Sequence, residues 1–204
     1  MKINITCPCG NNIPFEYNEV IDLDSDPIIL ETIFNGTFMS VKCPSCFKNH
    51  KPELRITLNW KSKNYNLLVI PELERGDFYL NKKEAANTET VISFPEMAER
   101  LTVIKDKLEP VVIETIKSYI LAKAEDNYPD IDINVWYYCI GPSGLEFHLD
   151  GIRQNEVAIM IITHEMYNNT LQEYKKQPKK SIFTSLRVRS YLSVQNLLRH
   201  DVLK

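Results

Sequence analysis

The spacing of apolar residues changes twice along the chain. Up to residue 71, short stretches alternate apolar and polar positions as strands do, interrupted by one helical segment over 27–34. Residues 94–127 instead repeat apolar positions at helical spacing. From 133 onward the strand period returns over 133–140, 145–151 and 156–163, and two further helical segments end the chain. Runs of strands followed by helices predict an α+β fold with a C-terminal antiparallel sheet.

Local signals fix several helix ends. Asp26 is a candidate N-cap, Pro27 occupies the first helical position, and Gly36 marks the stop of the helix predicted over 27–34. Pro95 and Pro110 each head a helical pattern, which indicates two central helices rather than one long helix.

One apolar stripe on the second central helix is wide enough to cover a sheet face. The uninterrupted run "VAIMII" at 157–162 is read as a buried third strand of the C-terminal sheet. The residues predicted to share one core are Val112, Ile113, Ile116, Ile120, Val135, Val157, Ile159 and Ile161.

The polar, irregular stretch after Pro71 is the best candidate for a boundary. The sequence therefore predicts a zinc-ribbon-like β region over residues 1–71, a connecting segment over 72–90, and an α+β domain over 91–204.

Four of the five cysteines lie in two short turns. Cys7-Pro8-Cys9 is followed by a glycine, and Cys43-Pro44-Ser45-Cys46 ends a predicted strand. A Cys-x-x-Cys turn places two sulfurs on one side of a tight loop, and two such turns complete a tetrahedron around a metal ion. We therefore expect Cys7, Cys9, Cys43 and Cys46 to bind structural Zn²⁺.

Other uses of these cysteines stay open. Iron also suits a tetrahedron of thiolates, and a disulfide pair or a redox role is a further alternative. His50 lies four residues after Cys46 and is an alternative ligand, although a surface histidine beside the turn is the simpler interpretation. Four thiolates leave no open coordination position, which argues against zinc hydrolysis.

Several stretches together resemble the CpXC family of bacterial and archaeal proteins, which is named for two Cys-Pro-x-Cys motifs. They are "ITCPCG", "DPIILETIFNGTF", "VKCPSC" and "YNLLVIPE", with "ERLTVIKDKLEPVVIETIKSYI" behind them. The resemblance covers roughly residues 3–125. It implies a zinc-binding role for the four cysteines and no defined activity. The chain departs from the pattern at its shorter first motif and at Phe47, where glycine is common.

Composition and the lengths of the apolar runs indicate an ordinary globular protein and suggest its cellular compartment. The net charge is −3, and 44% of residues are hydrophobic, as in ordinary globular proteins. No window approaches the ~18 apolar residues of a membrane span, and no secretory leader is recognisable. We expect a cytoplasmic protein, where clustered cysteines bind metal more often than they form disulfides. The abundance of Asn, Lys and Ile suggests an AT-rich bacterial genome.

A basic segment marks the end of the chain. Residues 175–204 contain eight Lys or Arg against one Asp. This segment, or the ribbon, is the candidate surface for nucleic acid, and a solvated helix face is the simpler alternative. The basic candidates are Lys175, Lys176, Lys179, Lys180, Arg187, Arg189 and Arg199.

No complete catalytic motif is recognisable, so no catalytic or cofactor-binding residue is assigned. Glu146, His148 and Asp150 alternate on one predicted strand and could form an acid–base site, but a solvated strand face explains them as well. The sequence thus favours a non-enzymatic interaction, adaptor or regulatory module with a protein partner or a second copy of itself. Nucleic-acid binding and an unrecognised enzyme are the alternatives.

Overall fold

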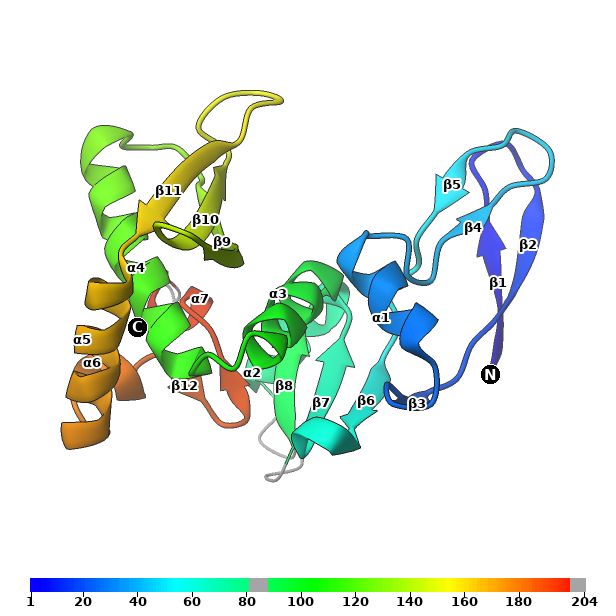
Figure 1. The fold of residues 1–204 in the computed structure, drawn as a ribbon. Coiled ribbons are helices and arrows are strands. Elements are labelled where there is room, and N and C mark those ends of the chain that lie inside the picture. The colour runs from blue at the N-terminus through cyan, green and yellow to red at the C-terminus, as the bar shows by residue number, and fades with distance from the viewer. Residues whose placement is uncertain (81–87, 199–204) are drawn as a thin grey trace. The chain divides into compact units, whose positions relative to one another are not determined.

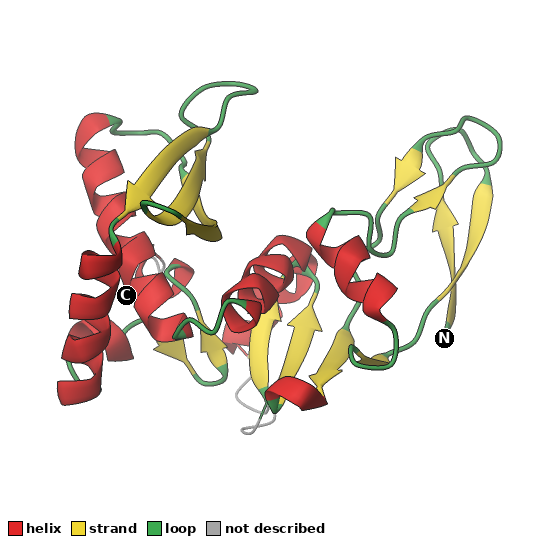
Figure 2. Ribbon diagram, in the orientation of Figure 1, coloured by secondary structure: helices red, strands yellow, loops and turns green. Residues whose placement is uncertain are grey.

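The computed structural model describes residues 1–80 and 88–198. The chain divides into two compact units, Met1–Ala98 and Glu99–Lys204. Helices and strands occur in both units, and the C-terminal sheet is antiparallel, so the predicted α+β class is confirmed (Figures 1 and 2). None of the helices in the described part of the chain is long and apolar enough to cross a membrane.

The first unit begins with short strands around the cysteine turns and continues into a sheet. Its elements are β1 (Lys2–Thr6), β2 (Asn12–Glu16), β3 (Val20–Asp22), α1 (Pro27–Phe34), β4 (Val41–Lys42), β5 (Asn49–His50), β6 (Ile56–Trp60), η1 (Lys61–Lys63), β7 (Tyr65–Ile70), η2 (Glu72–Glu74), α2 (Arg75–Leu80) and β8 (Glu89–Ile92). β1 pairs with β2 and β4 with β5, both antiparallel. The larger sheet runs in the order β8-β7-β6-β3 within this unit.

The predicted ends of α1 are confirmed. The Asp26 side chain accepts a hydrogen bond from the backbone N–H of Ile28, and Pro27 occupies the first turn, where its missing N–H needs no partner. The predicted connecting segment starts as the ordered elements η2 and α2, and its residues 81–87 lie outside the described part of the chain.

The second unit places helices against one face of a three-stranded sheet. Helix α3 (Phe94–Lys105) contains the division between the units. The elements after it are α4 (Pro110–Asn127), β9 (Asn134–Gly141), β10 (Gly144–Asp150), β11 (Ala158–Ile162), α5 (His164–Lys176), α6 (Ser181–Thr184), β12 (Arg187–Val188), β13 (Tyr191–Leu192) and α7 (Gln195–Leu198). The strand order is β11-β10-β9, α4 contacts β9, and α5 contacts β10. In the final segment β12 and β13 form a short antiparallel hairpin before α7.

The predicted core is correct for the helix and wrong for β11. Val112, Ile113, Ile116 and Ile120 of α4 are buried with Val135 of β9 in the core of the second unit.

The error concerns which face of β11 points inward. Val157, Ile159 and Ile161 are 56%, 62% and 46% exposed, whereas Ile162 is buried and Met160 packs against the core. β11 is an edge strand in the order β11-β10-β9, and only one of its faces is covered. An unbroken apolar run conceals the two-residue period of a half-covered strand.

The core role of α4 gives a stability prediction. Ile116 is fully buried among core residues, so Ile116→Ala should reduce the free energy of unfolding by about 2–5 kcal/mol through lost burial and a cavity. Ile131→Ala removes the same atoms at a 37% exposed position and should lose well under half as much. Equal losses in denaturant melts of the two variants would contradict the packing of α4.

Candidate metal centre

The cysteine motifs form the loops of two small hairpins in the first unit. Cys7 and Cys9 lie between β1 and β2, and Cys43 and Cys46 lie between β4 and β5. Cys7 and Cys43 are buried with Ile13, whereas Cys9 and Cys46 are exposed. The two hairpins thus bring the four sulfurs close together, and two of them, those of Cys7 and Cys43, are buried.

The two loops close differently, which explains how the shorter motif reaches the site. In the first loop the Gly10 N–H donates to the carbonyl of Cys7, three residues before it. In the second loop the Phe47 N–H donates to the carbonyl of Cys43, four residues before it, so this loop is one residue longer. Gly10 (φ 87°) and Phe47 (φ 60°) each follow the second cysteine of their motif and both have left-handed backbone conformations. Glycine adopts this conformation without steric penalty, whereas the Cβ of Phe47 makes it less favourable in the second loop.

The sulfur spacing matches a tetrahedral thiolate site. Cys7 Sγ and Cys46 Sγ lie 3.5 Å apart, Cys9 Sγ and Cys43 Sγ lie 3.7 Å apart, and all four sulfurs lie within 4.8 Å of one another. A tetrahedron with Zn–S bonds of about 2.3 Å has edges of about 3.8 Å. The four residues named from the sequence can therefore hold one metal ion.

Backbone hydrogen bonds and burial act in opposite directions on the thiols. Hydrogen bonds from the backbone of Cys46 and, less strongly, of Ser45 outweigh burial and lower the pKa of Cys43 to about 6. The Cys9 backbone lowers the pKa of Cys7, but burial and the neighbouring sulfurs outweigh that effect and raise it to about 12. The negative charge is therefore favoured on Cys43, and binding of a metal ion would displace the proton of Cys7.

Two polar side chains that surround the sulfurs were not assigned from the sequence. His50 Nε2 lies 3.2 Å from Cys7 Sγ, and Asn11 Nδ2 donates to Cys43 Sγ at 3.8 Å. Each reaches a buried sulfur, where a hydrogen-bond donor offsets the negative charge of a thiolate. Only the position of His50 four residues after Cys46 signalled such a role, and nothing in the sequence distinguishes Asn11.

The contact of His50 predicts an effect on metal affinity. His50→Ala should weaken zinc binding by about 10- to 100-fold in competition with a chelator, because partners of the ligands orient and neutralise them. His164→Ala, at the exposed start of α5, should leave the affinity unchanged. Complete loss of metal binding in the His50 variant would make the imidazole a ligand, and an unchanged affinity would remove its role.

The strand residues proposed as an acid–base site are already partnered. His148 Nε2 lies 2.7 Å from Glu146 Oε1, and the imidazole stacks on Tyr138 at 4.1 Å. Asp150 instead accepts hydrogen bonds from Trp136 Nε1 and Asn134 Nδ2, each at 3.0 Å. The structure therefore brings Glu146 and His148 together but does not join Asp150 to them.

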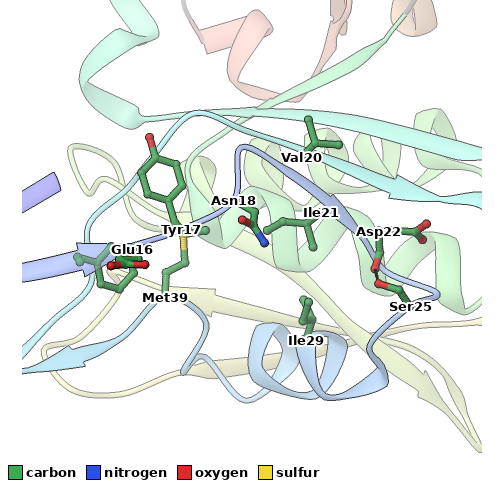
Figure 3. Close-up of a pocket in the computed structure, with 10 residues that line it drawn as sticks. Glu16, Tyr17, Asn18, Val20, Ile21, Asp22, Ser25, Ile29 and Met39 are labelled. Carbon is green, nitrogen blue, oxygen red and sulfur yellow. Dashed lines mark hydrogen bonds between the residues drawn. The ribbon is translucent and has the colours of Figure 1, made fainter. Parts of the chain in front are cut away.

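A groove of about 470 Å³ lies beside β3 and α1 in the first unit (Figure 3). Val20, Ile21, Ile29 and Met39 contribute apolar lining, and the acidic groups are Glu16 and Asp22. Glu16 pairs with Lys2 at 2.6 Å and Asp22 with Lys61 at 2.5 Å. Hydrogen bonding to Lys61 lowers the pKa of Asp22, so this carboxylate is ionised at neutral pH and is unsuited to donating a proton.

Two hairpins bring four cysteine sulfurs together, and this cluster could hold a metal ion as in ribbon-like proteins. The CpXC protein family model matches residues 5–117, so the chain belongs to the CpXC family, as the sequence motifs predicted. An uncharacterised protein of Treponema pallidum (strain Nichols) is 28% identical over 96% of this chain and 98% of its own length. No solved structure matches the chain.

Proposed function

We propose that the four cysteines hold a structural zinc ion and that the protein acts as a non-enzymatic interaction module in an adaptor or regulatory role. The observation that carries the proposal is the set of four sulfurs within 4.8 Å of one another. Thiolates in all four positions leave no place for a water or substrate, as in zinc sites that stabilise a fold. The metal would then keep a small surface rigid for a partner.

Native mass spectrometry of the purified full chain tests this proposal, because it reports the metal and any assembly together. One zinc per wild-type chain, absent from Cys43→Ser, together with an assembly of the wild-type chain with a partner or a second copy, is the expected result. One iron per chain would assign the alternative metal, since iron also suits four thiolates. A metal-free wild-type chain would contradict the proposal.

A second candidate function is nucleic-acid binding by the ribbon. Residues 1–15 and 37–52, which surround the cysteines, contain no Asp or Glu, and their lysines are Lys2, Lys42, Lys48 and Lys51. Phe47 is 66% exposed between the last three lysines, and Lys42 Nζ lies 5.7 Å from its ring centre. Lysines that contact phosphates and an aromatic ring that stacks on bases are features of single-strand binding.

The C-terminal basic residues are exposed wherever the structure describes them, and Lys180 pairs with Glu173. Arg199 lies outside the described residues. Fluorescence anisotropy with single-stranded oligonucleotides distinguishes the two surfaces. Binding through the ribbon should weaken steeply with salt and should be lost in a Lys42→Ala, Lys48→Ala variant but not in Lys175→Ala, Lys176→Ala. Absent or salt-insensitive binding would remove this candidate.

A further inference from the structure

The sheet of the second unit has an outer face that the helices do not cover. Register places Glu146 beside Ile161 and His148 beside Ile159, all on the side opposite the buried Phe147. We call this surface, which also includes Tyr138 and Val157, the outer face. Tyr138 is 57% exposed, and Val157, Ile159 and Ile161 are about half exposed or more. Apolar side chains that gather on one face, rather than occurring singly, indicate an interaction surface.

β11 adds an uncharged edge to this face. Residues 157–163 contain no charged side chain, and within the described residues β11 has a strand neighbour only on the β10 side. The opposite edge strand is different, because the Glu99 carboxylate accepts the backbone N–H of Tyr137 on β9 at 2.6 Å. Natural sheets usually protect exposed edges with charges, prolines or bulges. β11 has no charge and no proline, so none of its side chains opposes burial of its outward side against a partner.

The polar groups of the outer face satisfy one another. Glu146 pairs with His148, and the Asp150 oxygens accept hydrogen bonds from Trp136 and Asn134. Burying polar groups is costly chiefly when they lose water without gaining a partner. The outer face can therefore be covered without leaving its central polar row unsatisfied.

We propose that the outer face packs against the outer face of a second copy of this chain, with β10 over β10, in a two-fold symmetric dimer. On the outer face, β9 presents aromatic side chains, β10 polar and charged ones, and β11 aliphatic ones. A two-fold axis that lies in the plane of the face, perpendicular to the strands, places each strand over the same strand of the second copy. An axis perpendicular to the strands and level with Phe147 places each Glu146 over the second copy's His148. Each Glu146 carboxylate then faces an imidazole that can form a hydrogen bond with it, whereas an axis along the strands would place two Glu146 carboxylates together.

The size of the face fits a reversible dimer. Three strands about 4.8 Å apart and about six residues long cover roughly 14 Å by 20 Å, or on the order of 500 Å² of accessible surface once side chains are included. Two copies would bury about 1,000 Å², near the lower limit for a specific protein–protein interface. This inference rests on the interaction role proposed above and identifies a second copy as the partner.

Sedimentation equilibrium of the full chain over a wide concentration range tests the dimer. The dissociation constant should rise by about 100-fold or more in Ile159→Lys, because an unpaired charge would be buried. Ile28→Lys, at a 65% exposed position on α1, is the matched control and should dimerise like the wild type. The dimer should persist at high salt, which screens charges but not apolar contact.

A charge exchange tests the orientation. Glu146→Lys should weaken the dimer by removing both the pair within the chain and the contact with the second copy. Combining it with His148→Glu should restore most of the association, because the two introduced charges would be opposite in sign, both within the chain and across the interface.

Three results would overturn the proposal: a monomer at every concentration, equal association of Ile159→Lys and Ile28→Lys, or no rescue by the double variant. Hydrogen-exchange protection of the β11 amides on association would also overturn it, because it would indicate edge pairing instead. Zinc content is measured in the same samples. Failure of the dimer in zinc-loaded protein would thus leave the metal proposal standing, and loss of zinc would be recognised separately.

Discussion

Cys43→Ser should be purified without metal, and the residues around the two hairpins should lose their structure. Cys43 is fully buried, and its hairpin consists of two strands of two residues each. The apolar cluster beside the site contains only Cys7, Ile13 and Cys43, with Ile5 and Val41 packed against it. An isolated two-stranded hairpin is marginally stable in water, so a metal ion held by the four cysteines would supply most of the stability of this region.

The change should stay local. The β6-β7 pair has its own buried side chains, and the second unit has a separate core. Cys139→Ser is the control, because Cys139 lies on β9 and does not belong to the four-sulfur group. Elemental analysis measures the metal, and hydrogen exchange resolved along the chain locates the change. Metal retained at the wild-type level in Cys43→Ser, or a loss of protection that spreads through α4, would contradict this expectation.

Glu114→Ala should reduce the free energy of unfolding of the second unit by about 3–5 kcal/mol, as expected when one member of a buried ion network is removed. The Glu114 side chain is 4% exposed and contacts Arg100 at 3.2 Å and Lys117 at 3.3 Å. Its other oxygen accepts the backbone N–H of Val194 at 2.8 Å. The variant would leave these buried donors without this carboxylate.

The rest of the network shows why the loss should be large. Lys117 also pairs with Glu99 at 2.7 Å, and burial raises the pKa of Glu99 although Lys117 lowers it. With Glu114 removed, one carboxylate and two cations remain in a buried site. Glu125→Ala, at an exposed position on the same helix, should change stability by less than about 0.5 kcal/mol. Similar denaturant melts for the two variants would show that the network contributes little.

The sequence by itself determined the features that depend on neighbouring residues. Asp26 and Pro27 fixed the start of α1, because a cap acts on backbone groups within one turn. The cysteine-proline turns identified the four residues of the candidate metal centre, since turn chemistry is local. The helical stripe of α4 likewise identified its buried face, because a helix repeats every 3.6 residues whatever covers it.

Only the tertiary structure decided the features that depend on which distant segments pack against a strand, a loop or a helix. β11 is apolar on both sides, so its sequence could not show that Ile159 and Ile161 point away from the helices. The distance from His50 to Cys7 depends on how two hairpins meet, and the residues are 43 positions apart. The ion network joins α3, α4 and the segment at Val194. From the sequence alone, its charged residues would be placed on solvent-exposed helix faces. In each case the decisive contact is between residues far apart in sequence, where no local preference acts.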